Sequence, residues 1–411
     1  MRVLMLCNTR YQILNAINAK MTLFVDDCVD FICISEAEDI NRLTERIREL
    51  NIFNKVLRVK QKKVNVHAYL KNIVSGKKND AGLCEVIKNT FLDVCSSINA
   101  KKEDDLLVEL VDGYSKGDYK QYSKILANCG TEIVNTIYRL VKEDKNKCEL
   151  AILDEGVNSY VVADWGSFGT VADSAYLYEP VLCTSGIKKL YTLPKIENPD
   201  IKKAVVHVFG WDNEVRSINN SIVIFEQPYR RMPKYFFGGV GCKILRKILY
   251  NSYKKHLRDS IQFDHQEMLI SYIGNYKTRT EKFIKYHPAS FDTDEYDWKN
   301  QIKQMQIYKT PWEVQLLNSE NDNNICVTVG STAACTTEIF NNSNNNNKYI
   351  FLFDIYRQEF EIEDAKYEFF LNMKRHKPNK VFMPRSIQEL DKILSDLLIA
   401  QESVAKPTTT A

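Results

Sequence analysis

Short apolar runs alternate with amphipathic segments along the first part of the chain. The runs Arg2–Cys7, Val29–Ser35 and Lys55–Val59 predict strands, whereas the residues from Tyr11 onward and the segment Asp39–Leu50 place their apolar side chains on one helical face. Strands that alternate with helices are typical of a parallel sheet covered on both faces. We therefore expect the chain to open with a Rossmann-like unit.

The same alternation restarts in the second half, after a mixed segment, Thr192–Asn219, whose sparse stretch PKIENPD indicates a linker. The apolar runs that predict further strands are Ser221–Phe225, Glu281–Tyr286, Met305–Tyr308, Ile325–Val329 and Tyr349–Phe353, the last of them being the final strand. The asparagine-rich stretch Asn341–Asn347 predicts a loop, and Ser386–Ile399 predicts an amphipathic helix.

A chain of 411 residues is too long for one ordinary hydrophobic core. We expect an α/β protein with two Rossmann-like domains that face each other across a cleft, residues 1–200 and 201–380, followed by a C-terminal helix and tail, residues 381–411. Open parallel sheets bind ligands at the carboxyl ends of their strands. Polar residues directly after the predicted strands are therefore the first candidates for a site.

Two neighbouring acids and a glycine follow the apolar strand Glu149–Leu153. In Asp154-Glu155-Gly156, one carboxylate can face the cleft while the other holds the turn. A partly desolvated carboxylate beside a like charge has a raised pKa, which suits a general base. The triplet also fits an ordinary surface turn, and the sequence does not decide which of the two acids would be the base.

Two further motifs follow predicted strands of the second half. His287-Pro288 follows Glu281–Tyr286; an imidazole can protonate or hydrogen-bond a departing phosphate, and the proline stiffens the loop. Gly330-Ser331-Thr332 stands between a strand and a helix, where backbone N–H groups and hydroxyls can hold a phosphate. A structural histidine and a common helix cap fit the same residues.

Two segments keep two interpretations each. Asp292-Thr293-Asp294 matches the DxD pattern of metal-dependent sugar transferases, but it also fits a charged surface loop. Arg230–Arg258 carries nine Lys or Arg residues and no acid, interleaved with aromatic and aliphatic residues. It fits docking to an anionic membrane surface, and equally a helix with a core face and a solvated basic face.

Composition narrows the class of protein. The 56 Lys and Arg residues nearly balance the 53 Asp and Glu residues, which argues against a nucleic-acid partner. The eleven cysteines form no CxxC pair, so we expect free thiols in a reducing compartment. The N-terminus enters a strand at once, and no apolar run approaches the ~18–20 residues of a spanning helix. We therefore expect a cytoplasmic protein, peripheral on the inner face of the membrane if the basic segment docks there.

Taken in order, the motifs resemble those of bacterial sialyltransferases. The set is an N-terminal strand reading LMLCNTRYQ, the Asp-Glu-Gly triplet, Gln227-Pro228, His287-Pro288, Pro311-Trp312-Glu313 and Ser331-Thr332. The chain is most similar to the lipooligosaccharide and capsule enzymes of glycosyltransferase family 52, with the polysialyltransferases as relatives, from Met1 to about Phe353. The resemblance implies a GT-B fold, a CMP-sialic acid donor, inversion at the anomeric carbon, and no metal or other cofactor.

The resemblance also implies a role for individual residues. Glu155, with Asp154 as second choice, would take the proton of the acceptor hydroxyl, and His287 would assist the departure of CMP. The donor-binding residues would be Gly330, Ser331, Thr332, Pro288, Glu313, Trp312 and Gln227, with Glu313 at the ribose hydroxyls. The residues lining the acceptor side of the cleft would be Asn8, Thr9 and Gly156. The acceptor would be a galactose-terminated, lipid-linked glycan of a capsule or lipooligosaccharide.

Two other functions stay open at this level. A hexosyltransferase could use a UDP-sugar on the same scaffold, and a twin-Rossmann protein without catalysis could serve as a scaffold in capsule assembly. The linkage (α2,3 or α2,6), the addition of one sugar or a polymer, and the formation of a homodimer are equally open.

Overall fold

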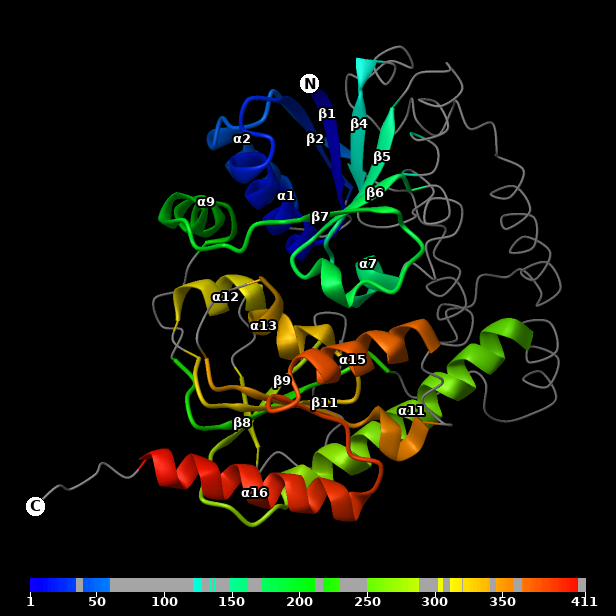
Figure 1. Ribbon diagram of the computed structural model, residues 1–411, viewed down its shortest axis with the longest axis vertical. Helices are drawn as coiled ribbons and strands as arrows, with labels where there is room; N and C mark the ends of the chain where they lie inside the picture. Colours follow the sequence, from blue (N-terminus) through cyan, green and yellow to red (C-terminus); the bar gives the residue numbers. More distant parts are fainter. Residues whose placement is uncertain are drawn as a thin grey trace, which may run out of the picture.

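The computed structural model describes residues 1–34, 40–59, 121–127, 134, 137, 148–161, 172–210, 217–229, 250–287, 302–305, 311–319, 321–340, 345–357 and 364–405. Within these ranges the chain forms two parallel sheets, one in each half, and Figure 1 shows the first sheet above the second. The statements below concern these residues.

The first sheet has the strand order β3-β2-β1-β4-β5-β6-β7, and every neighbouring pair is parallel. Its strands are β1 (Arg2–Cys7), β2 (Cys28–Ile34), β3 (Lys55–Val59), β4 (Lys124–Ala127), β5 (Glu149–Leu153), β6 (Ser174–Leu177) and β7 (Lys189–Thr192). The central strands are almost wholly buried, which explains why they are continuous apolar runs and not alternating ones.

The second sheet has the order β10-β9-β8-β11-β12-β13 and is also parallel throughout. Its strands are β8 (Ile222–Phe225), β9 (Lys282–Lys285), β10 (Lys303–Gln304), β11 (Ile325–Thr328), β12 (Lys348–Phe351) and β13 (Val381–Phe382). Counted within its own half this is the order 3-2-1-4-5-6, the Rossmann order, and the first sheet has the same order with one strand added. The strand order reverses between β1 and β4, and again between β8 and β11, so each sheet has a crevice where ligands bind.

Helices cover the sheets. The helices of the first half are α1 (Arg10–Thr22), α2 (Ile40–Glu49), α7 (Val157–Val161), the 3-10 helix η2 (Pro180–Leu182) and α9 (Pro199–Phe209). Those of the second half are α11 (Tyr250–Gly274), α12 (Trp312–Asn318), η5 (Thr332–Cys335), α13 (Thr336–Phe340), η6 (Phe353–Tyr356), α15 (Asp364–His376) and α16 (Ile387–Ala405). In Figure 1, α12, α13 and α15 lie on the side of the second sheet that faces the first sheet, and α16 lies on the far side.

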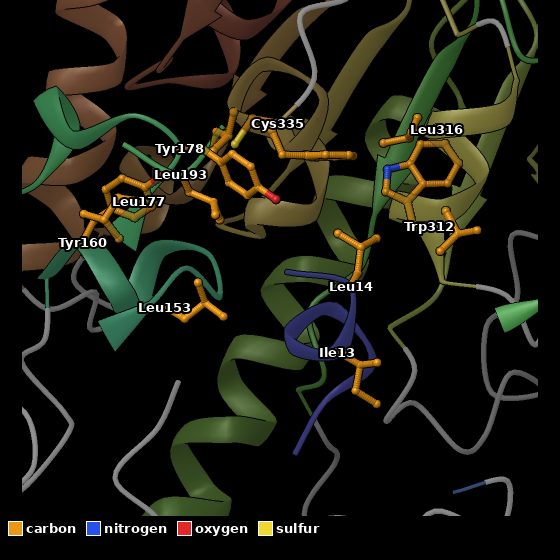
Figure 2. Packing of buried hydrophobic residues seen from close by; sticks show 14 of the residues in the cluster. Ile13, Leu14, Leu153, Tyr160, Leu177, Tyr178, Leu193, Trp312, Leu316 and Cys335 are labelled. Carbon is orange, nitrogen blue, oxygen red and sulfur yellow. The ribbon is translucent and has the colours of Figure 1, made fainter. Parts of the chain in front are cut away.

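The two halves pack against each other through aromatic side chains. Phe340 of α13 lies with its ring centroid 6.4 Å from that of Tyr11 in α1, and its backbone carbonyl accepts a hydrogen bond from Ile196 N at 3.1 Å. The ring centroids of Tyr160 in α7 and Phe369 in α15 lie 5.1 Å apart. Figure 2 shows side chains of both halves in this one buried cluster. The cluster holds the strand ends of the two sheets near each other.

The predicted fold class, α/β with two Rossmann-like sheets, is confirmed. The linker prediction was wrong in part: Pro199 of the stretch PKIENPD begins helix α9, because Asn198 caps that helix by accepting from Asp200 N at 2.8 Å. Helix α9 contacts α1, α2 and α12, and the predicted boundary at 200/201 falls inside it.

The end of the second sheet also differs from the prediction. The strand β10, Lys303–Gln304, lies directly before the range predicted as a strand, Met305–Tyr308, of which only Met305 is within the described residues. Tyr349–Phe353 is not the last strand, because Val381–Phe382 pairs with β12 as β13. The segment from residue 381, expected to be only a helix and tail, therefore begins with an edge strand of the sheet. Two residues carry no readable periodicity, which is why this strand was missed.

Candidate active site

Asp154 holds the acidic turn together. Its carboxylate is fully buried and accepts hydrogen bonds from Gly156 N at 2.9 Å, from the Tyr160 hydroxyl at 2.5 Å and from Tyr178 N at 3.2 Å. Burial raises the pKa of Asp154 to about 6, against the lowering effect of these three donors. Because its oxygens are occupied by the protein itself, Asp154 supports the turn after β5 from inside.

Glu155 is the acid of this turn that is the better candidate for a general base, because Asp154 is held by the turn itself. Its backbone N–H donates to Ser159 Oγ at 2.7 Å, and its carboxylate accepts a hydrogen bond from Gln12 Nε2. Burial raises the pKa of Glu155 to about 8, and the charge of Asp154 adds to this, whereas donation from Gln12 and Asn158 lowers it. At pH 7 most of the Glu155 carboxyl is therefore protonated, and the fraction that has lost its proton is the form that can act as a general base.

Asn8 and Thr9 lie at the end of β1 as predicted, but their polar groups serve helix α1. Thr9 is its N-cap and accepts from Gln12 N at 3.2 Å, while Gln12 Oε1 accepts from Thr9 N at 3.1 Å and from Asn8 N at 2.6 Å. This reciprocal arrangement is a capping box. It brings the side chain of Gln12, which the sequence did not single out, to Glu155.

The ends of β8 and β9 form the facing wall. His287 N donates to Glu226 Oε2 at 3.1 Å, and Glu226 is buried at the end of β8. Burial lowers the pKa of His287, and the nearby positive charge of Lys285 lowers it further. The imidazole is therefore neutral at pH 7, where it can donate a hydrogen bond through one ring N–H. The backbone of Gln227 is held by Gln266, which accepts from Gln227 N at 2.8 Å.

The turn after β11 carries the hydroxyl pair. Ser331 N donates to Thr328 Oγ1 at 3.0 Å, so this backbone N–H is used inside the protein. Ser331 stands at the N-cap of η5, yet its side chain makes no capping hydrogen bond. The Ser331 hydroxyl therefore does not cap the helix, which is the common role of a serine at this position. The side-chain hydroxyls of Ser331 and Thr332 therefore stay candidates for binding a phosphate.

The acidic turn and the hydroxyl pair meet across the two halves. Gly156 has a φ of +100°, and a Cβ atom added to it would lie 2.9 Å from Thr332 Oγ1. Only glycine adopts this backbone conformation without strain and leaves room for the threonine hydroxyl. The contact places motifs that are far apart in the sequence at one site.

A cleft of about 490 Å³ opens at this contact. From the first half it is lined by Val157 and Asn158 of α7, directly after the acidic turn. The lining residues of the second half are Gln227, Tyr229, Arg258, Asp259, Gln262, His287, Gly330, Ser331, Thr332, Lys366 and Phe370. A cleft of this size suits a small-molecule ligand. Glu155 is not itself one of the lining residues, but its hydrogen-bond partner Asn158 is.

Several predicted donor-binding residues lie elsewhere. Trp312 is buried and packs edge-on against Phe225, with ring centroids 5.4 Å apart, so it is placed in the core and not on the wall of this cleft. Glu313 lies beside Lys285, whose charge opposes the rise that burial causes in the pKa of Glu313. Pro288 and Asp292–Asp294 fall outside the described residues, as does the part of Arg230–Arg258 before Tyr250.

The sequence missed the wall formed by α11 and α15. Arg258 and Asp259 are consecutive on α11 and Gln262 follows about one turn later, while Lys366 and Phe370 lie four residues apart on α15. Spacing of this kind marks one face of a helix. Nothing in the sequence distinguishes a face that lines a cleft from a solvated face, so no signal was available for these residues.

The described residues show no cluster of metal-binding side chains and no spanning helix. In the part of the chain that the structure describes, no group of three or more His, Cys, Asp or Glu side chains is placed to hold a metal ion, and no helix is long and apolar enough to cross a membrane. Asp292 and Asp294 lie outside that part, so independence of metal stays a prediction. The cytoplasmic location and the membrane docking of Arg230–Arg258 stay predictions as well.

No protein-family model matches the chain, and no curated protein matches it. Among solved structures, it is similar to an α/β-galactoside α-2,3-sialyltransferase from Photobacterium phosphoreum (TM-score 0.46, 10% identity, 93% of this chain and 98% of that one). It is also similar to a sialyltransferase from Photobacterium damsela (0.42, 12%, 93% and 81%) and to MurG from Acinetobacter baumannii (0.41, 11%, 100% and 97%).

These likenesses do not identify a donor or an acceptor, because their identities are at most 12% and their TM-scores are below 0.5. The two sialyltransferases are family 80 enzymes, and the expected kinship with family 52 stays a prediction. The fold itself follows from the chain's own topology: two Rossmann-like sheets with a cleft between them are the GT-B arrangement.

Proposed function

We propose that this chain is a nucleotide-sugar glycosyltransferase, and specifically an inverting sialyltransferase that moves sialic acid from CMP-sialic acid to a galactose-terminated glycan. The observation that carries the proposal is the contact between Gly156 and Thr332. This contact brings Glu155, the candidate base of the first half, close to Ser331 and Thr332, the candidate phosphate-binding residues of the second half. Both groups lie at strand ends, where open parallel sheets bind ligands.

The chemistry requires a base on one side of the sugar and a leaving-group site on the other. Glu155 takes the proton from the acceptor hydroxyl while the oxygen attacks the anomeric carbon. The bond from that carbon to the CMP phosphate oxygen breaks as the new bond forms, and attack from the opposite face inverts the configuration. The electron pair of the broken bond stays on the phosphate.

The second half supplies the groups that stabilise this developing charge. The hydroxyls of Ser331 and Thr332 and a ring N–H of His287 can donate to the phosphate oxygens, with Gln227 and Gly330 completing the wall. Arg258 and Lys366, against the single acid Asp259, give the far wall a net positive charge, which suits a donor that carries a phosphate and a carboxylate. Hydrogen bonds and fixed positive charges of this kind are sufficient for a monophosphate leaving group, so we expect no metal or other cofactor.

The acceptor side of the proposal comes from the resemblance of the motifs. A glycan of a capsule or lipooligosaccharide, ending in galactose and linked to a lipid, fits a peripheral location at the inner face of the membrane. Asn8, Thr9 and Gly156 belong to this side of the site, and they fix Glu155 and its turn through the cap of α1 and the close contact at Thr332.

A donor comparison tests the proposal. The purified protein is incubated with lactose and CMP-sialic acid, UDP-galactose or UDP-glucose, and products are identified by NMR, with thermal shifts measured in CMP and in UDP. We expect transfer from CMP-sialic acid and stabilisation by CMP. Glu155→Gln should retain the stabilisation by CMP and lose transfer. Transfer from a UDP-sugar with stabilisation by UDP alone would instead make the chain a hexosyltransferase, and no transfer from any donor would favour a scaffold.

A further inference from the structure

The side-chain amide of Gln12 can take only one orientation. A glutamine amide accepts hydrogen bonds through its oxygen and donates them through its nitrogen. Gln12 is 1% exposed, and its Oε1 accepts from two backbone N–H groups, those of Asn8 at 2.6 Å and Thr9 at 3.1 Å. A flipped amide would set its NH₂ group against these two donors. The nitrogen is therefore committed to the other side, where it donates to Glu155 Oε2.

The cap of helix α1 does not require a glutamine at position 12. The third position of a capping box accepts Glu as readily as Gln, because the box uses only a side-chain oxygen there. Glutamine alone adds a donor on the side away from the cap. At this position, the donor meets the carboxylate of Glu155 in the turn after β5, 143 residues further along the chain.

Other described neighbours of Glu155 fit this arrangement. Asp154, in the same turn, is the charged group that acts on Glu155, and its own carboxylate is held by other donors. Asn158 from α7 is the second side-chain donor to Glu155. From the second half, Thr332 approaches the adjacent Gly156. Gln12 is thus the donor that α1 contributes to this carboxylate.

We propose that Gln12 is a positioning residue, which fixes the Glu155 carboxylate through an amide locked by the cap of α1 and favours its proton-accepting form. The inference rests on the proposed function for the role of Glu155 as base. The contact itself, and its effect on the protonation of Glu155, do not depend on which sugar is transferred.

The substitution Gln12→Glu separates this role from the helix cap. It keeps an oxygen for Asn8 N and Thr9 N, and these two N–H groups favour the charged form of the new carboxylate. Glu155 then loses a donor and gains a negative neighbour, so its pKa rises. Because each pKa unit is a factor of ten on the acid limb of a pH profile, kcat/KM at pH 7 should fall at least tenfold and recover toward high pH.

Two measurements distinguish the possible failures. The carboxyl carbon of Glu155 is titrated by ¹³C NMR, with its signal assigned by its loss in Glu155→Gln, and kcat/KM is measured against pH. We expect Gln12→Glu, and more weakly Gln12→Met, to raise the pKa of Glu155 and to move the acid limb with it. Asn198→Ala removes the cap of α9 as a control for lost helix stability, and should leave both quantities unchanged.

An unchanged pKa of Glu155 in both Gln12 variants would overturn the inference. A uniform loss of activity at all pH values, without a change in the titration, would also overturn it, because a purely structural residue behaves in that way. If the titration shifts while the acid limb of the pH profile does not, the contact acts as inferred, and it is the proposed role of Glu155 as base that fails.

Discussion

Gly156 and Thr332 follow strands of different sheets and lie against each other. Gly156 closes the turn after β5 with a φ of +100°, and a Cβ atom there would come within 2.9 Å of Thr332 Oγ1. The distance between the acidic turn and the hydroxyl pair is therefore set by the absence of one side chain. A cleft that joins two domains depends on such contacts, because a small shift of either domain changes the distance between base and leaving group.

Replacing Gly156 by alanine should destabilise the protein and impair transfer. The positive φ alone costs a non-glycine residue about 1–3 kcal/mol, and the new methyl group must also displace the Thr332 hydroxyl. Urea denaturation measures the loss of stability, and steady-state kinetics measure the loss of transfer. Gly186→Ala is the matched control, since no atom lies within 4 Å of a Cβ atom there, and its stability should stay within about 0.5 kcal/mol of the wild type.

A second substitution tests the contact itself. Thr332→Ala removes the hydroxyl that the Cβ atom would meet, so it should relieve the steric part of the cost of Gly156→Ala and leave the backbone strain. The two changes should therefore be non-additive in a double-mutant cycle. Strictly additive free energies of unfolding would mean that the two residues are not in contact.

Substitution of the two acids of the turn should have different effects, on stability for Asp154 and on catalysis for Glu155. Asp154→Asn places an NH₂ group among three donors in a fully buried site, and should lower the free energy of unfolding by about 1–3 kcal/mol. Glu155→Gln should leave the fold intact and reduce kcat by about 10²–10⁴, the usual contribution of a general base. Denaturation and transfer assays on both variants check this. The reverse pattern would make Asp154 the base.

The raised pKa values give stability a defined dependence on pH. The pKa of Glu155 rises from 4.5 in the unfolded chain to about 8 in the folded protein, so between these values the folded state holds a proton that the unfolded state has lost. The free energy of unfolding therefore falls as pH rises from 4.5 to 8. Asp154 contributes in the same direction between 3.8 and about 6.

Glu155→Gln should remove the larger of these two effects. Relative to the wild type, the variant should gain stability progressively between pH 4.5 and 8, by an amount on the order of a few kcal/mol at most. Urea denaturation at several pH values measures the gap, and other titrating groups such as His287 cancel in the comparison. Parallel curves for the two proteins would show that Glu155 titrates near its ordinary pKa.

Much of the fold could be predicted because burial on both faces leaves a clear signal. The strands at Arg2–Cys7, Lys55–Val59 and Glu149–Leu153 have the predicted bounds. Arg2–Cys7 and Glu149–Leu153 are apolar after their first residue, almost wholly buried, and followed directly by polar residues. Strands without such a run, as at Val381–Phe382, had no signal. The polar residues after the strands were good candidates for the same reason, because a parallel sheet brings all carboxyl ends to one edge.

The sequence does not show which polar groups already make hydrogen bonds within the folded protein. The pattern gives Asp154 and Glu155 equal standing, and only the tertiary contacts of Tyr160 and Tyr178 assign the first to the turn. Nothing in the sequence paired Gln12 with Glu155, because the two residues are 143 positions apart. Trp312 next to an acid suggested a nucleotide wall, but its indole fills the space against Phe225.

The hydroxyls of Ser331 and Thr332 should determine donor affinity. Ser331 makes no capping bond with its side chain, and both residues line the cleft, so each hydroxyl can donate to the CMP phosphate. A hydrogen bond to a charged group contributes about 1.5–3 kcal/mol, so Ser331→Ala and Thr332→Ala should each weaken CMP binding by at least about tenfold. Isothermal titration calorimetry measures this directly. Ser386→Ala, which removes a hydroxyl bonded to Glu389 N beside α16, serves as the control and should not alter CMP affinity. If both cleft variants bind CMP as tightly as the wild type, these hydroxyls do not hold the phosphate. The phosphate site would then lie elsewhere, nearer Lys285 and Glu313.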